Sequence, residues 1–143
     1  MTHSPRVLQP AAWPRPRGYA NGIAVAGKTI FLAGQIGWDA QGQFAEGLAN
    51  QVGQALGNIV ALLAEAGAMP QHVVRLTWFV TDMRAYRDSQ AAIGAAYRAV
   101  MGKHFPTMSV VGVSQLVEPQ ALVEIEATAV LPPQSLDTPT IAN

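Results

Sequence analysis

Apolar residues recur every three or four positions through the middle of the chain, the spacing that places them on one face of an α-helix. The run begins at Leu48, and Gly67 supplies a stop signal with Pro70 beyond it. The pattern therefore predicts a helix over 48–66, whose buried face holds Leu48, Val52, Leu56, Ile59, Leu63 and Ala66.

A second run at helical spacing lies in the last third of the chain. It is marked by Tyr86, Ile93 and Tyr97 and continues through Val100 until Gly102 closes it. The sequence thus predicts two helices in all.

Segments rich in β-branched and aromatic residues, or alternating between apolar and polar, predict strands. The first two such segments are separated by a turn at Gly27-Lys28, which indicates a hairpin. Combined with the helices, the order is ββαβαββ, which implies one sheet with both helices on one face, an α+β arrangement. The predicted strands span 20–25, 29–36, 73–80, 107–113 and 121–131.

Proline-rich stretches flank this regular part of the chain. Residues 1–17 contain four prolines and are expected to run extended over the surface or to be partly disordered. The same prolines interrupt any apolar stretch that could act as a signal peptide, so the expected location is the cytoplasm. The predicted organisation is an N-terminal extension (1–17), one domain (18–132) and a C-terminal tail (133–143).

Charge and composition exclude several classes of function. Only 13% of the 143 residues are charged and the formal net charge is zero, so neither nucleic acid nor a membrane is an expected partner. So few charges cover a small surface poorly, which favours self-association. The chain has no cysteine, and its three histidines (His3, His72 and His104) lack ligand spacing, so neither a metal nor another cofactor is predicted.

The last predicted strand carries two carboxylates on one face. The stretch "VEIEATAV" alternates strictly, which sends Glu124, Glu126 and Thr128 to one side of the sheet. Next neighbours on a face lie roughly 7 Å apart, so one carboxylate could act chemically while the other stays solvated. The pattern alone does not separate this interpretation from an ordinary solvent-facing stripe.

Other candidate residues also have two interpretations. Trp38 and Asp39 could contact a ligand at a site's rim, but a packed turn is the preferred interpretation. Tyr19 could donate its hydroxyl to a ligand or simply pack. His104 could be a base or an exposed loop residue.

Taken in order, the motifs resemble the RidA/YjgF family of enamine/imine deaminases, which hydrolyse 2-imino acids to 2-keto acids and ammonia. The stretches "GYANGIAVAGKTIFLAGQIG" and "QALGNIVALLAEAGA" are similar to its opening hairpin and first helix. "VVRLTWFVTDM" resembles its central strand, and "FPTMSVVGVSQL" with "ALVEIEATAV" resemble its closing strands. The resemblance spans about Gly18 to Pro132.

The resemblance implies a chorismate-mutase-like fold and a homotrimer with three clefts between subunits, each binding a small molecule. Glu124 would orient or activate the attacking water, and Tyr19 would help to bind the substrate. The remaining residues implied to line the cleft are Ala33, Gly34, Gly94, Met108 and Val110.

Three positions depart from the family pattern. Active members carry an arginine that binds the substrate carboxylate at the position of Met108, and methionine offers only apolar surface there. Gly94 stands where asparagine is common, and Val110 where cysteine is frequent. Whether Arg17, Lys103 or His104 replaces the missing cation is left open by the sequence.

The function that the sequence favours is hydrolysis of an imine or enamine in a mostly apolar pocket, on a neutral or weakly polar ligand, with weak or no activity on ordinary 2-imino acids. The alternative is a non-enzymatic trimer that binds a ligand or protects other proteins as a holdase. Ribonuclease activity is disfavoured by the zero net charge and by the lack of a histidine pair.

Overall fold

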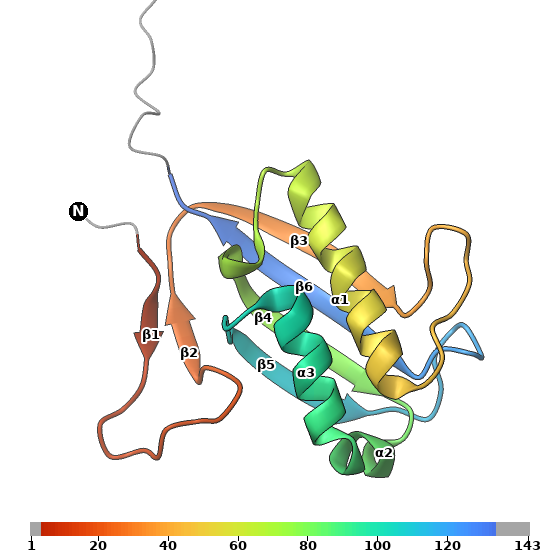
Figure 1. Cartoon of the computed structure of the whole chain (residues 1–143). Coiled ribbons are helices and arrows are strands. Elements are labelled where there is room, and N and C mark those ends of the chain that lie inside the picture. Colours follow the sequence, from red (N-terminus) through yellow and green to blue (C-terminus); the bar gives the residue numbers. More distant parts are fainter. Residues whose placement is uncertain (1–3, 134–143) are drawn as a thin grey trace, which may run out of the picture.

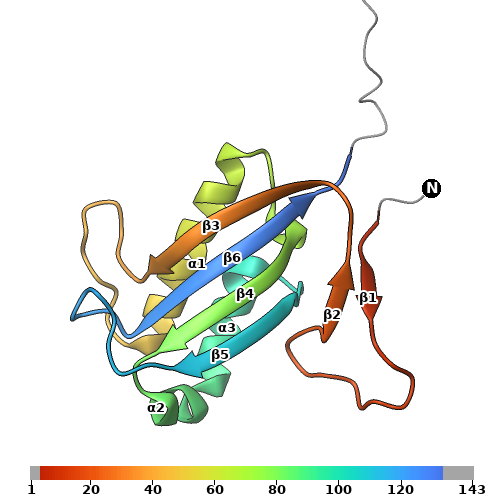
Figure 2. The ribbon, with the colours of Figure 1, turned by 180° about the vertical axis from the view of Figure 1, so that it is seen from behind.

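A four-stranded mixed sheet with helices on one face forms the body of the protein, as the computed structural model of residues 4–133 shows (Figure 1). The opposite face of the sheet is free of helices when seen from behind (Figure 2). The protein is therefore α+β, as predicted. In spatial order, the strands are β3 (Lys28–Ile36), β6 (Val123–Leu131), β4 (Val73–Val80) and β5 (Thr107–Gly112).

Helix α1 (Leu48–Glu65) confirms the first predicted helix, and its apolar stripe forms much of the core. The helix ends where Gly67 adopts a φ of 70°, a conformation that a residue without a Cβ reaches freely. The backbone N–H groups of Gly67 and Ala68 then donate to the carbonyls of Ala64 and Leu63, respectively, so these two carbonyls in the last turn have hydrogen-bond partners. A single turn of 3₁₀ helix (Pro70–His72) leads into β4.

The prediction of one continuous second helix is wrong, because the segment forms two helices. Helix α2 (Met83–Asp88) begins where the Asp82 carboxylate accepts a hydrogen bond from the N–H of Ala85 at 3.0 Å. At Ser89 the backbone leaves helical geometry (φ −110°, ψ 18°), and helix α3 (Gln90–Met101) follows. The N–H of Ser89 donates to the carbonyl of Tyr86, and its carbonyl accepts from the N–H of Ile93, so the backbone of Ser89 joins the two helices.

The predicted hairpin between 20–25 and 29–36 does not form. Strand β2 (Gly22–Ala24) pairs instead with β1 (Arg6–Leu8), inside the segment expected to run along the surface, while β3 pairs with β6. A Cβ on Gly27 would lie 2.3 Å from the carbonyl oxygen of Leu131, so the turn packs against the end of β6. That contact directs β3 onto β6 rather than back onto β2. The predicted tail lies outside the described residues except for Pro133.

The alternation predicted for the last strand is confirmed. Val123, Ile125, Ala127 and Ala129 are buried beneath the helices. Glu124, Glu126 and Thr128 are at least partly exposed on the other face. No helix within residues 4–133 is both long enough and apolar enough to cross a membrane.

One buried polar side chain, Gln51 on α1, ties the helix to the loop before β6. Its amide nitrogen donates to the carbonyl of Gln120 at 3.1 Å, and its amide oxygen accepts from the N–H of Leu122 at 2.8 Å. Gly37 makes this possible, since a Cβ there would lie 2.5 Å from the Cβ of Gln51. The loop thus gains two partly buried hydrogen bonds from the helix.

Replacing Gln51 with leucine would remove both hydrogen bonds to the loop, each of which contributes about 0.5–1.5 kcal/mol. We expect Gln51→Leu to lower the free energy of unfolding by about 1–3 kcal/mol, measured by urea denaturation. Gln71→Leu, at an exposed glutamine, is the matched control and should change stability little. Equal losses in the two variants would show that the Gln51 bonds do not stabilise the fold.

Candidate functional site

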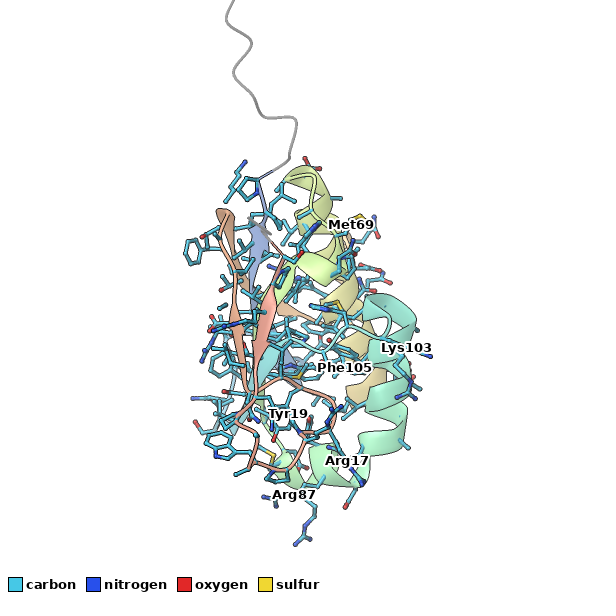
Figure 3. The ribbon with its side chains drawn as sticks, turned by 90° about the vertical axis from the view of Figure 1, so that its left-hand side faces the viewer. Arg17, Tyr19, Met69, Arg87, Lys103 and Phe105 are labelled. Carbon is cyan, nitrogen blue, oxygen red and sulfur yellow. The ribbon has the colours of Figure 1, made fainter. Side chains whose placement is uncertain are left out.

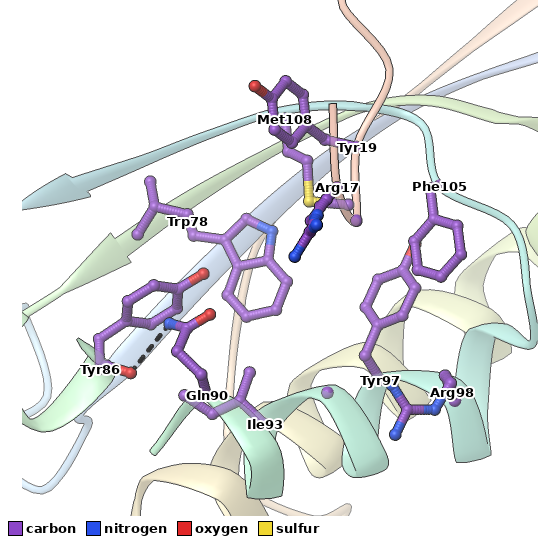
Figure 4. Close-up of a pocket in the computed structure, with 13 residues that line it drawn as sticks. Arg17, Tyr19, Trp78, Tyr86, Gln90, Ile93, Tyr97, Arg98, Phe105 and Met108 are labelled. Carbon is purple, nitrogen blue, oxygen red and sulfur yellow. Dashed lines mark hydrogen bonds between the residues drawn. The ribbon is translucent and has the colours of Figure 1, made fainter. Parts of the chain in front are cut away.

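A cavity of about 540 Å³ lies on the helix side of the sheet, between β5, helix α3 and the loop that precedes β2 (Figure 4). Its walls are mostly aromatic and apolar. We call it the helix-side pocket. It is lined by Arg17, Gly18, Tyr19, Trp78, Tyr86, Gln90, Ile93, Gly94, Tyr97, Arg98, Phe105, Met108 and Val110.

The loop that carries Arg17 and Tyr19 is held against the start of β5. The N–H of Ala20 donates to the carbonyl of Pro106 at 3.0 Å, and Ala20 forms a parallel β-bridge with Thr107. Tyr19 and Arg17 therefore lie at the pocket, close to one another in the side view of the molecule (Figure 3). Lys103 is exposed at the end of α3 and does not line the pocket.

Four aromatic rings form one wall of the pocket. Trp78 stacks on Tyr97 with ring centroids 6.4 Å apart, Tyr97 stacks on Phe105 at 5.6 Å, and Tyr86 meets Trp78 edge-on at 6.2 Å. Burial raises the pKa of Tyr97 above its ordinary value of 10.0, which favours the protonated hydroxyl that donates to the carbonyl of His104. This wall gives the pocket a fixed shape.

His104 has a structural role beside this wall. Its backbone carbonyl accepts the hydroxyl of Tyr97, and its Nε2 lies 2.7 Å from the carbonyl oxygen of Val73. His104 does not line the helix-side pocket. Of Arg17, Lys103 and His104, which the family resemblance left open as substitutes for a cation at position 108, only Arg17 lines the pocket.

Glu124 lies on the opposite face of the sheet. Met108 and Val110 pair with Leu76 and Trp78 of β4, whose side chains face the helices. Glu124 pairs with Phe79, which faces the other way. The sheet therefore separates the Glu124 carboxylate from the helix-side pocket of its own chain.

Because Gly34 has no side chain, the Glu124 side chain can lie directly against strand β3. A Cβ on Gly34 would lie 2.6 Å from the carboxyl carbon of Glu124, so any larger residue would push the carboxylate away. Ala33 lies on the same open face, in a shallow hollow that also includes Arg75, Thr77 and Glu126. Ala33, Gly34 and Glu124 thus form a second group of residues, which we call the open-face group.

The predicted site residues therefore separate into two sets within one chain. Tyr19, Gly94, Met108 and Val110 come together in the helix-side pocket, and Ala33, Gly34 and Glu124 do not join them. Sequence reasoning missed two features of the pocket, its aromatic wall and Arg98. The alternation along 73–80 could have placed Trp78 on the side of Met108, but nothing in the sequence predicts that the Arg98 side chain points into the pocket.

Trp38 and Asp39 belong to a turn, which confirms the preferred interpretation. The Asp39 carboxylate accepts from the N–H groups of Gln41 and Gln43, each at 2.9 Å, and the Trp38 ring packs on Phe44. Among residues 4–133, no three histidine, cysteine, aspartate or glutamate side chains gather as they would around a metal ion.

The fold and the pocket define an α+β protein with the YjgF/Rid fold, and comparison with known proteins agrees. The Endoribonuclease L-PSP family profile matches residues 11–131. The chain belongs to this family, the RidA/YjgF family that its motifs predict.

Relatives across bacteria match most of the chain. A RutC family protein of Synechocystis is 36% identical over 135 residues, which covers 89% of this chain and 97% of the relative. The 2-iminobutanoate/2-iminopropanoate deaminase of Salmonella typhimurium is 34% identical over 116 residues, 78% of this chain and 86% of that enzyme.

Solved structures extend the likeness to three dimensions. The Rid-family protein YyfB of Yersinia pestis matches with a TM-score of 0.79 at 35% identity, over 89% of this chain and 98% of that protein. The YjgF gene product of Escherichia coli matches with a TM-score of 0.63 at 32% identity, over 78% and 87% of the two chains.

Proposed function

We propose that the protein hydrolyses an imine or enamine to a carbonyl compound and ammonia, in a homotrimer whose sites are completed between subunits. Family membership and relatives named as 2-iminobutanoate/2-iminopropanoate deaminases support the reaction class. The open-face group, with one glutamate held beside a glycine, and the helix-side pocket, with room for a small molecule, are the parts that such a reaction needs.

The observation that carries this proposal is the separation of Glu124 from the helix-side pocket. Since β4 and β6 send the two groups to opposite faces, one chain cannot place both on one substrate. Strand β5 is an edge of the sheet, and so is β3, which carries Ala33 and Gly34. In the trimer that we propose, the β3 side of one chain faces the β5 side of the next, and the two groups meet across the interface.

In the proposed reaction, water adds to the C=N carbon of an imine. The Glu124 carboxylate takes a proton from this water as the C–O bond forms and returns it to the nitrogen. The carboxylate next takes the proton of the new hydroxyl group and passes it to the nitrogen. As the C–N bond breaks, ammonia leaves and the C=O bond of the product forms. Tyr19 holds the substrate through its hydroxyl, and the apolar walls exclude bulk water. Met108 leaves β5 without a cation at the point where the family resemblance implies one.

Only one of the two glutamates on β6 should matter for hydrolysis. We expect Glu124→Gln to lower the rate by at least about 100-fold, because it removes the proton acceptor while keeping the size of the side chain. Glu126→Gln, two positions along the same face, is the matched control and should retain the wild-type rate. An amino-acid oxidase would generate imino acids in situ, and their disappearance would be followed. The opposite pattern would place the site around Glu126.

Mixing two inactive variants tests whether the site is shared between chains. Gly94→Phe would fill the helix-side pocket, and Glu124→Gln would disable the open-face group. In trimers refolded from an equal mixture, each site has about one chance in four of receiving an intact half from each chain, so about a quarter of wild-type activity should return. Light scattering would confirm the trimer. An active protein with a monomeric mass, or no recovery in mixed trimers, would contradict the shared site.

Restoring a cation on β5 should raise activity on small 2-imino acids. A charge-assisted contact with the substrate carboxylate stabilises binding by about 1.5–3 kcal/mol. We therefore expect Met108→Arg to raise kcat/KM by roughly ten- to a hundred-fold, with Met108→Gln as an uncharged control. If Met108→Arg forms the same trimer as wild type yet stays at the uncatalysed rate, the deaminase proposal loses its main support and a binding or holdase role becomes the better explanation.

A further inference from the structure

The helix-side pocket has a strong asymmetry of charge. Arg17 and Arg98 are among its lining residues, and no aspartate or glutamate is. The protein as a whole has equal numbers of acidic and basic residues, so two unopposed cations in one pocket are not a reflection of overall composition. A cavity lined by cations and apolar rings suits a ligand that has an anionic end and an apolar body.

Trp78 presents an unused hydrogen-bond donor at this pocket. The side chain is only 2% exposed, and within residues 4–133 its indole Nε1 has no hydrogen-bond partner. A buried donor without an acceptor destabilises a protein, and such groups are rare in native structures. Because Trp78 lines the pocket, the acceptor that is missing can be supplied by a ligand.

The polar groups of Arg17 and Trp78 lie in the same part of the pocket. The Arg17 guanidinium and the indole nitrogen of Trp78 point toward each other in the close-up view, with the Met108 side chain near both (Figure 4). Arg17 is carried by the loop that the bond between Ala20 and Pro106 fixes against β5. A carboxylate placed there would accept a hydrogen bond from the indole and a charge-assisted one from the guanidinium.

Gly94 makes room for the second cation. Arg98 lies one helical turn after Gly94 on α3, and its Nη1 is 3.2 Å from the position that a Cβ on Gly94 would occupy. An asparagine at this position would therefore displace the guanidinium. The glycine thus allows Arg98 to add a positive charge along the α3 side of the pocket.

We propose that the helix-side pocket binds a carboxylate attached to an aromatic or bulky apolar group, with the carboxylate held by Trp78 Nε1 and Arg17 and attracted by Arg98. The site takes the place of the single cation that Met108 does not provide. The apolar body of the ligand packs against Met108, Val110 and Ile93, since a thioether favours contact with aromatic rings. This inference rests on the proposed function and narrows its substrate to imino acids with large apolar side chains.

Binding of stable probes tests the site without turnover. We expect 3-phenylpropanoate to bind at least tenfold more tightly than 3-phenylpropanamide, which lacks the charge, and than propanoate, which lacks the ring. Isothermal titration calorimetry would give the three affinities. Equal affinity for the acid and the amide, or no binding of any probe, would overturn the proposal.

Variants assign the contacts. Arg17→Gln should weaken 3-phenylpropanoate binding at least tenfold and Arg98→Gln about threefold, because Arg98 acts at longer range. Gly94→Asn should resemble Arg98→Gln. Arg87→Gln, at an exposed arginine of α2 that does not line the pocket, is the control and should bind as wild type does. If the Arg17→Gln and Arg87→Gln proteins bind equally well, Arg17 does not hold the carboxylate.

The indole N–H provides a direct spectroscopic readout. Nitrogen–proton correlation spectra contain one indole signal for each of the three tryptophans, and the signal lost in Trp78→Phe identifies Trp78. Saturation with 3-phenylpropanoate should move this signal downfield, whereas the amide probe at equal occupancy should move it less. If Trp78→Phe does not fold, Trp13→Phe and Trp38→Phe assign the signal by elimination. An unmoved Trp78 signal would overturn the contact.

The two proposals fail separately. Probe binding as expected, together with no hydrolysis of any imino acid, would leave the carboxylate site standing and remove the deaminase. Hydrolysis with no preference for charge or ring would remove the carboxylate site alone.

Discussion

The alternation of side chains along β6 and β4 is the constraint on which the rest of the structure depends. These strands lie in the middle of the sheet, and every second residue packs beneath the helices, along β6 from Val123 and along β4 from Leu76 onward. Because Val123 and Ile125 are buried beneath the helices, Glu124 between them must point to the other face. Leu76 is also buried there, and its partner Met108 therefore lies on the helix side. A shift of one residue in either register would exchange core and surface and is therefore strongly disfavoured. The hydrophobic core thus decides where the polar groups lie.

Glycines then determine how closely the polar groups approach their neighbours. Gly34 admits the Glu124 carboxyl group, Gly37 admits the Gln51 side chain, and Gly94 leaves space for the Arg98 guanidinium. In each case, a side chain from another position occupies the space that a Cβ on the glycine would need. At Gly94, the space that a side chain would need is occupied by the guanidinium of Arg98.

The sequence predicted the elements that form around continuous apolar patterns. Helix α1 and the alternation of β6 were predicted because their apolar residues are periodic, and strand β4 because its segment is rich in β-branched and aromatic residues. The pairing of β2 was not predicted, since β3 is nearer in sequence and the close packing of Gly27 on Leu131 is a tertiary contact. The break at Ser89 was missed because the apolar spacing continues across it.

The candidate site was predictable to a similar extent. The family resemblance identified seven positions, four of which share the helix-side pocket. It placed all seven in a cleft between subunits. Within one chain, the strand register puts Glu124 on the face opposite the pocket, and Ala33 and Gly34 lie with it. Arg98 could not be assigned from the sequence because the direction of a long, flexible side chain depends on the space left by its neighbours.

The short hairpin of β1 and β2 has a consequence for motion. Strand β1 is exposed along its whole length and pairs only with β2, outside the main sheet. Elements with so little buried surface open at a small fraction of the global free energy, so their amide protons should exchange with solvent early. The loop between the two strands carries Arg17 and Tyr19, and the link from Ala20 to Pro106 attaches it to β5. One wall of the pocket thus belongs to a weakly buried part of the fold, and a ligand that contacts it would also slow that exchange.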